Sequence, residues 1–256
     1  MDHDAAAWLA AELAGSRWGA FEWVAATGST NADLAAAWRD GASDGRVLVA
    51  DFQSDGRGRF DRSWVAPPGA MVALSALLRP EADDLFRWAW LPLATGLAVA
   101  EALRETAGVP AAVKWPNDVL VGESKICGIL TERALGPGGA AIVIGIGVNT
   151  AMTRAQAPVA RATSLAMLGA PAEPRPLVAA VLRRLDAWYA RWAAGEDLAV
   201  PYAAGCATIG RDVRVLVSAD EAIEGRAAGV DADGHLLVDT PSGRRAFAAG
   251  DVWHLR

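Results

Sequence analysis

The chain is organised around the loop of residues 51–64, which reads DFQSDGRGRFDRSW. Apolar runs at 47–50 and 71–78 precede and follow this loop, and we expect both to be strands. Glycine lets backbone N–H groups approach a ligand closely, and arginine offers forked donors that match carboxylate and phosphate. The loop therefore predicts an anion site. A solvated basic turn, partly neutralised by Asp55 and Asp61, is the alternative that this stretch alone leaves open.

Composition and charge exclude several classes of protein. The 256 residues carry a net charge of −6, which argues against a general attraction to nucleic acid. Two cysteines, Cys127 and Cys206, and three scattered histidines match neither a disulfide framework nor a zinc site. The amino terminus lacks the basic region of a signal peptide, and no apolar stretch reaches the roughly twenty residues of a membrane span. We therefore expect a cytoplasmic protein with no nucleic-acid partner and no membrane partner.

Residues 1–205 have the pattern of one large α+β domain. Its strand-like runs follow one another through short turns, so we expect a mixed or antiparallel sheet flanked by helices rather than a parallel wound sheet. Pro92 predicts a kink or break in the long third helix. The helices are expected at 4–14, 30–39, 84–106 and 175–194, and the strands at 21–24, 47–50, 71–78, 112–115, 119–121, 125–131 and 141–149.

A second domain is expected at residues 206–256, because the composition changes near Gly205. Turn sequences at 233–234 and 241–243 separate short β-type runs. This pattern predicts a small β-barrel. Its strands are expected at 213–217, 223–227, 236–239, 244–248 and 252–255.

Another polar stretch is the turn at residues 114–118, Lys-Trp-Pro-Asn-Asp, between two expected strands. Asp118 could hold Mg²⁺ through its oxygen atoms. Lys125 and Gly128 lie in the next expected strand. Each of these residues could be an ordinary strand-edge residue. Together with the loop of residues 51–64, which we call the arginine loop, they suit a ligand that carries several negative charges and a metal ion.

Hydroxyl and amide side chains mark the start of the helix expected at 30–39. Thr30 with Asp33 fits a capping box, so Ser29, Thr30 and Asn31 could serve only as a helix cap. A helix N-terminus is equally a place for an anion or for the polar head of a ligand. Asn149 could likewise end its strand or contact a ligand.

With these pieces in this order, the chain resembles the bacterial biotin–protein ligases, in the monofunctional type that lacks an N-terminal DNA-binding domain. The likeness runs from residue 21 to the end, and its tail resembles the SH3-like C-terminal domain of the family. The matching stretches are Ser29-Thr30-Asn31, Gln53 with Gly56-Arg57-Gly58-Arg59 and Arg62-x-Trp64, Lys114-Trp115-Pro116-Asn117-Asp118, Lys125-x-x-Gly128-Ile129-Leu130, and Gly145-Ile146-Gly147-Val148-Asn149.

The resemblance implies a fold and a reaction. The catalytic domain would be of the biotin/lipoate ligase type, similar to class II synthetases. Biotin would be activated by ATP, with Mg²⁺, to biotinyl-5′-AMP, and then transferred to one lysine of a partner. The partner implied is the biotin carboxyl carrier protein or domain of acetyl-CoA carboxylase or a related carboxylase. The assembly expected is a monomer or a weak homodimer.

The resemblance also implies roles for residues. Ser29, Thr30 and Gln53 would hold the ureido ring of biotin, Trp64 would stack near the adenine, and Lys125 would neutralise charge at the α-phosphate. The implied biotin-binding set is Ser29, Thr30, Asn31, Gln53, Gly56, Arg57, Gly58, Arg59, Lys125 and Gly128. The implied ATP-binding set is Arg59, Arg62, Trp64, Lys114, Asn117 and Asn149, with Asp118 for the metal and with Lys125, Arg57 and Arg59 as the catalytic residues. We expect the empty loop to be mobile, because its arginines repel one another until a ligand arrives.

Two departures from the family pattern keep alternatives open. Asp61 stands where the family usually has glycine, and it could pair with a neighbouring arginine. Only 28 residues precede Ser29, too few for a helix-turn-helix domain, so a transcription factor is the weakest alternative. A lipoate–protein ligase shares the chemistry, and a non-catalytic biotin-binding protein would bind biotin without turning over ATP.

Overall fold

The computed structural model describes residues 2–60, 62–64, 66–81, 87–217 and 221–255. The helices are α1 (His3–Glu12), α2 (Thr30–Arg39), α3 (Trp90–Ala107), α4 (Pro174–Ala193) and α5 (Ala199–Gly205), with 3-10 turns η1 (Arg87–Ala89), η2 (Arg154–Gln156) and η3 (Ala166–Leu168). The strands are β1 (Ala20–Val24), β2 (Arg46–Ala50), β3 (Met71–Leu78), β4 (Ala111–Lys114), β5 (Asp118–Val121), β6 (Ser124–Gly136), β7 (Gly139–Asn149), β8 (Asp212–Leu216), β9 (Ala222–Val230), β10 (Leu236–Thr240), β11 (Gly243–Phe247) and β12 (Asp251–His254).

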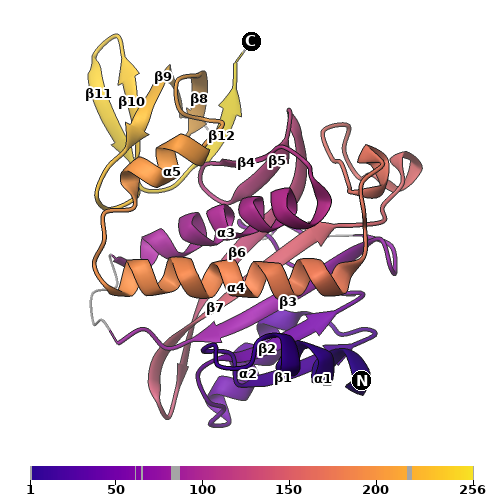
Figure 1. The fold of residues 1–256 in the computed structure, drawn as a ribbon. Coiled ribbons are helices and arrows are strands. Elements are labelled where there is room, and N and C mark those ends of the chain that lie inside the picture. Colours follow the sequence, from indigo (N-terminus) through magenta and orange to yellow (C-terminus); the bar gives the residue numbers. More distant parts are fainter. Residues whose placement is uncertain (1, 61, 65, 82–86, 218–220, 256) are drawn as a thin grey trace.

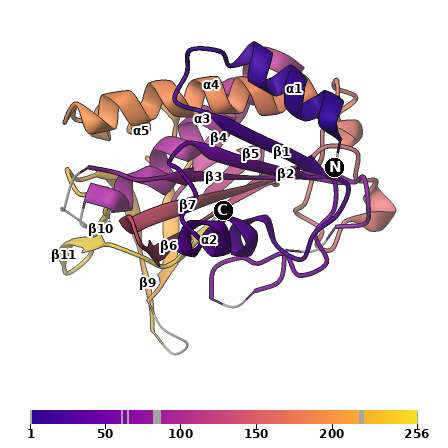
Figure 2. The same cartoon turned by 90° about the horizontal axis from the view of Figure 1, so that it is seen from below.

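A seven-stranded sheet forms the centre of the molecule, in the order β1-β2-β3-β7-β6-β5-β4 (Figure 1). Its neighbours are antiparallel except for β1 and β2, which run parallel. Figure 2 shows α1, α3 and α4 on one face of this sheet and α2 on the other. The sheet is therefore mixed, and α2 packs on the face opposite α1, α3 and α4.

Most expected elements occur close to their expected positions, and α3 shows why one detail of the prediction was wrong. Pro92 is the third residue of α3, which follows η1 directly. The N–H groups of a first helical turn need no partner within the helix, so proline starts this helix instead of kinking it. Residues 84–86, the first part of the helix expected at 84–106, lie outside the described residues.

The cap of α2 corrects a second detail. Ser29, not Thr30, is the N-cap, because Ser29 has the extended backbone and its hydroxyl accepts the N–H of Ala32 at 3.4 Å. Asp33 instead accepts a hydrogen bond from Thr27. The hydroxyl of Thr30 is thereby free to turn away from the helix end, toward the large sheet.

The C-terminal strands form a separate five-stranded antiparallel sheet in the order β11-β10-β9-β8-β12. The small β-domain expected from the turn spacing is therefore present, and within the described residues β11 and β12 are the two ends of its strand order. The residues of β11 are exposed except for Phe247, which alone is buried in that strand. The helix α5, which sequence reasoning missed, ends at Gly205. The division at 205 and 206 stays a prediction.

The main core lies between the large sheet and the pair α3 and α4. The predicted apolar face of α4 is buried as expected, with Leu177, Val181, Leu185, Trp188 and Trp192 at its centre. In the part of the chain that the structure describes, no helix combines the length and the apolar character needed to cross a membrane.

Candidate active site

A cavity of about 360 Å³ opens on the face of the large sheet that carries α2. It is lined by the N-terminus of α2, the arginine loop, the turn before β5, and the strands β6 and β7. Of the predicted site residues it brings together Ser29, Thr30, Asn31, Gln53, Arg57, Gly58, Arg59, Arg62, Trp64, Asn117, Asp118, Lys125, Gly128 and Asn149. Gly56 and Lys114 do not line it, and Gly56 instead lines a second hollow formed by the loop and by Leu130 and Glu132.

Thr30, Asn31 and Gln53 in the cavity wall are hydrogen-bonded to one another and to Ser75, which does not line the cavity, and we call these four side chains the inner network. Gln53 Oε1 accepts the N–H of Thr30 at 2.8 Å and lies 3.0 Å from its hydroxyl. The Ser75 hydroxyl lies 2.7 Å from both the Thr30 hydroxyl and Asn31 Oδ1. Thr30, Asn31 and Ser75 are buried, so the protein holds these groups in place before any ligand arrives.

Ser75 was missed by sequence reasoning, although a signal existed. It is the one polar residue in the otherwise apolar run of β3, which is buried along its whole length. A polar residue at a core position needs hydrogen-bond partners, and here the partners belong to the site. A serine within an apolar strand could therefore have been taken as a candidate.

Both ends of the Asn31 amide are engaged by protein groups. Its Nδ2 donates to Leu130 O at 3.2 Å and to Glu132 Oε2 at 2.7 Å, while Oδ1 faces Ser75. Gly145 on β7 makes room for it, since a Cβ there would lie 2.3 Å from Asn31 Oδ1. Asn31 thus shapes the wall of the cavity, and Gly145 relieves packing at that point.

The first two arginines of the loop each have partners within the protein. Arg57 Nη2 lies 3.2 Å from Glu132 Oε2 in an ion pair. Arg59 Nη1 donates to Asn117 Oδ1 and to the backbone oxygen of Gly250, both at 3.2 Å. Burial lowers the pKa of Arg59 from its ordinary value. The loop therefore joins β6, the turn before β5, and the C-terminal sheet.

The third arginine, Arg62, forms an ion pair with Asp251 at the start of β12. We expected the repulsion between the loop arginines to be offset only by a ligand, and this was wrong. Acidic side chains and carbonyl oxygens of the protein already offset it without a ligand. Its mobility stays a prediction. Asp61, whose pairing with a neighbouring arginine was expected, lies outside the described residues.

Asp118 and Lys125, which line the cavity, form a second charged group together with Lys114, which does not line it. Lys125 Nζ lies 2.6 Å from Asp118 Oδ1, and Lys114 Nζ lies 4.0 Å from Asp118 Oδ2. Burial lowers the pKa of Lys114, and the carboxylate of Asp118 acts in the opposite direction. Both oxygens of Asp118 thus face cations.

The indole of Trp64 lies close to two glycines of neighbouring strands, Gly128 and Gly147. A Cβ at Gly128 would lie 3.0 Å from the indole, and a Cβ at Gly147 would lie 2.5 Å from it. The ring also faces Lys125, whose Nζ is 5.1 Å from the ring centre. The absence of side chains at these two glycines therefore leaves the space that the indole of Trp64 occupies in the cavity wall.

The turn at 114–118 is anchored to the C-terminal sheet through the buried Trp115. Its indole N–H donates to Gly234 O at 3.0 Å, and its backbone N–H donates to the Thr208 hydroxyl at 3.2 Å. That hydroxyl also lies 3.1 Å from Nε2 of His254. Burial, aided by Lys114, lowers the pKa of His254 to about 4, so this imidazole is neutral at neutral pH.

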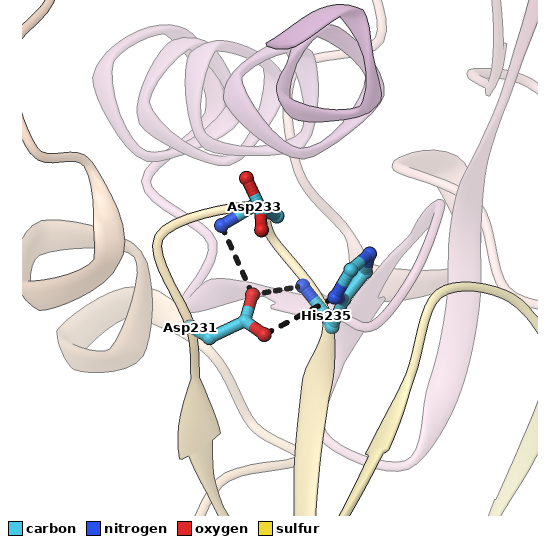
Figure 3. Close-up of side chains that lie close together, drawn as sticks. All are labelled: Asp231, Asp233 and His235. Carbon is cyan, nitrogen blue, oxygen red and sulfur yellow. Dashed lines mark hydrogen bonds and ion pairs between the residues drawn. The ribbon is translucent and has the colours of Figure 1, made fainter. Parts of the chain in front are cut away.

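Two further groups, the Cys127 thiol and the cluster at residues 231–235, lie outside the cavity lining. Burial raises the pKa of the Cys127 thiol, which therefore stays protonated and is no nucleophile. Asp231, Asp233 and His235 cluster in the turn from β9 to β10 (Figure 3). There Asp231 Oδ1 accepts the backbone N–H groups of Asp233 and His235, at 3.0 and 2.9 Å, and Oδ2 lies 3.1 Å from His235 Nδ1. These bonds close the turn.

Comparison with known proteins agrees with this geometry. Residues 25–149 match the Biotin/lipoate A/B protein ligase family, and residues 208–255 match the Biotin protein ligase C terminal domain. A biotin–[acetyl-CoA-carboxylase] ligase of Mycobacterium tuberculosis is 42% identical over 250 residues, covering 95% of this chain and 92% of that protein. A ligase of the same name from Paracoccus denitrificans is 33% identical, covering 90% of this chain and 98% of that protein.

Solved structures give the same family. The biotin protein ligase of Aquifex aeolicus, in complex with biotin and ATP, superposes with a TM-score of 0.78 at 29% identity, covering 93% of this chain and all of that one. The cavity described above, with its buried polar wall and its cations, suits these two substrates. The chain therefore belongs to the biotin protein ligase family and is a ligase that uses biotin and ATP.

Proposed function

We propose that the cavity binds the two substrates by two different means. The inner network takes the ureido ring of biotin, whose N–H and C=O groups match its fixed donors and acceptors. The arginine loop and Lys125 take the carboxylate of biotin and the phosphates of ATP. The observation that carries this proposal is that a buried neutral wall and a set of cations line one cavity.

The first step brings two anions together. A carboxylate oxygen of biotin forms a bond to the α-phosphorus of ATP, the bond to pyrophosphate breaks, and biotinyl-5′-AMP results. Charge neutralisation and positioning supply most of the catalysis for such a step. Lys125 is proposed to move from Asp118 to the α-phosphate, while Arg57 and Arg59 hold the carboxylate side.

The second step transfers the biotinyl group. The uncharged amine of the carrier lysine attacks the carbonyl carbon of the mixed anhydride, and AMP leaves. No covalent enzyme intermediate is required. Cys127, the buried thiol beside the cavity wall, is protonated and plays no part in this scheme.

We propose that Mg²⁺ would bind in this cavity together with the phosphates of ATP. Magnesium in such enzymes is bound by one or two carboxylates together with substrate phosphates. Asp118 is the predicted carboxylate, and its oxygens face Lys125 and Lys114. We propose that Asp118 first holds the lysines and becomes available to the ion once phosphates engage them.

The partner is proposed to be the biotin carboxyl carrier protein or domain of acetyl-CoA carboxylase or a related carboxylase. The two relatives described above are both biotin–[acetyl-CoA-carboxylase] ligases, and this supports the proposal. We further propose a cytoplasmic location and a monomer or weak homodimer.

The experiment is biotin-dependent exchange of pyrophosphate with ATP, run beside a lipoate control. Exchange with biotin alone is expected. Exchange with lipoate alone would move the protein to the lipoate ligases. Biotin binding with no exchange would contradict catalysis and favour a binding protein.

A further inference from the structure

Glu132 connects the inner network to the arginine loop, through contacts with Asn31 and Arg57. It lies on β6, opposite Val143 of β7, and its side chain is 32% exposed. One oxygen, Oε2, accepts from Asn31 Nδ2 at 2.7 Å and from Arg57 Nη2 at 3.2 Å. The same atom therefore touches the first turn of α2 and the arginine loop.

The hydrogen bond with Asn31 does not by itself require a negative charge at position 132. An amide donor is satisfied by any neutral acceptor, and the other hydrogen of Asn31 Nδ2 indeed goes to the carbonyl of Leu130. A guanidinium gains more from a carboxylate than from a neutral oxygen. The negative charge of Glu132 therefore serves the ion pair with Arg57. The hydrogen bond with Asn31 needs only an acceptor at this position of β6.

We infer that Glu132 is a positioning residue, which holds Arg57 beside the inner network so that the loop lies over the carboxylate of bound biotin. This inference rests on the proposed function, which places biotin across that junction. Glu132 lies outside the Lys125-to-Leu130 motif, and its negative charge acts on the reaction through Arg57. Its loss should release the loop from the wall without removing any group that contacts the reacting atoms.

Glu132→Gln tests the charge alone, since the amide oxygen of glutamine can still accept from Asn31. We expect the KM for biotin in pyrophosphate exchange to rise by a factor of about 2 to 5, the range for a partly exposed ion pair. The rate at saturating biotin should change less. In the Arg57→Gln background the same substitution should have no further effect, because Glu132 acts through Arg57.

Trypsin provides a readout that does not require activity. Without ligands, cleavage after Arg57 should be faster in Glu132→Gln than in the parent protein, with fragments identified by mass. The matched control is Glu22→Gln, because Glu22 pairs with Arg46 between β2 and β1 at a similar exposure, 30% and 35% for the two side chains. Glu22→Gln should leave both the cleavage and the KM unchanged.

The outcomes separate this inference from the proposed function. Unchanged cleavage at Arg57, or a KM effect that persists at full size in the Arg57→Gln background, would overturn the role of Glu132. Absence of exchange in the parent protein would instead overturn the proposed function, and the cleavage experiment would still decide whether Glu132 holds the loop.

Discussion

The two parts of the cavity differ in how their polar groups are satisfied. In the inner network, buried neutral groups bond to one another, and Asn31 is engaged at both ends of its amide. At the charged part, partly exposed cations pair with acids, as Arg62 does with Asp251 and Lys125 does with Asp118. Arg59 instead donates to an amide oxygen and a backbone carbonyl. The first arrangement recognises shape and hydrogen-bond pattern. The second can exchange its acids for the oxygens of a ligand.

The physical reason for the difference is solvent. A buried polar group without a partner costs about 1–3 kcal/mol, so the inner network must be complete before the ligand binds. A surface ion pair contributes only about 0–1 kcal/mol, so phosphates can replace the acids at little cost. A ligand should therefore reorganise the charged part and leave the inner network as it is.

The largest effect is expected from Lys125→Ala at the charged part. Biotin-dependent pyrophosphate exchange should fall by about 10²- to 10³-fold, as when one preorganised electrostatic contact is lost. Biotin binding by the inner network should persist, which equilibrium binding of biotin methyl ester can check. A loss of exchange smaller than tenfold would remove Lys125 from the proposed catalytic role.

The next effect is expected from Gly145→Ala at the inner network. The added Cβ would lie 2.3 Å from Asn31 Oδ1, and overpacking of this kind costs about 1–3 kcal/mol. Denaturant unfolding should show this loss, and biotin should bind more weakly. Gly229→Ala on β9 is the control, since a Cβ there has no neighbour within 4 Å. Equal stability of the two variants would contradict a rigid inner network.

Salt should separate the two parts without any mutation. Added salt screens exposed charges, and the screening length falls from about 10 Å at 0.1 M to about 3 Å at 1 M. The KM for ATP should therefore rise several-fold between these limits, while the affinity for biotin methyl ester, which carries no charge, should stay constant. An equal loss of affinity for ATP and for biotin methyl ester would contradict the distinction between a charged part and a neutral inner network.

The smallest effect is expected from Asp251→Asn, which removes the acid that pairs with Arg62. Stability should change by less than about 1 kcal/mol, because the pair is at the surface. The KM for ATP should fall slightly, since Asp251 no longer competes with phosphate for Arg62. Asp239→Asn, which breaks the exposed pair with Arg244 far from the cavity, controls for the loss of a charge. A rise in the KM for ATP would show that Asp251 assists nucleotide binding.

Short motifs predicted the cavity well because each one is local. The arginine loop, the 114–118 turn and the start of α2 carry their chemistry within a few residues, and the structure brings them to one place. Ser75 and Glu132 were missed because each stands alone in a strand. Their partners, Asn31 and Arg57, are far away in the sequence, so neither has a local pattern.

By itself, the sequence determined which chemical groups this protein carries and where most strands and helices begin and end, because hydrophobic periodicity and turn residues act locally. The tertiary structure alone decided which polar groups meet. It paired Glu132 with Arg57 and Asp251 with Arg62, and it placed Asn31 against Gly145. Such contacts depend on strand register and on the packing of the C-terminal sheet, which are set by the burial of the whole core rather than by any one segment.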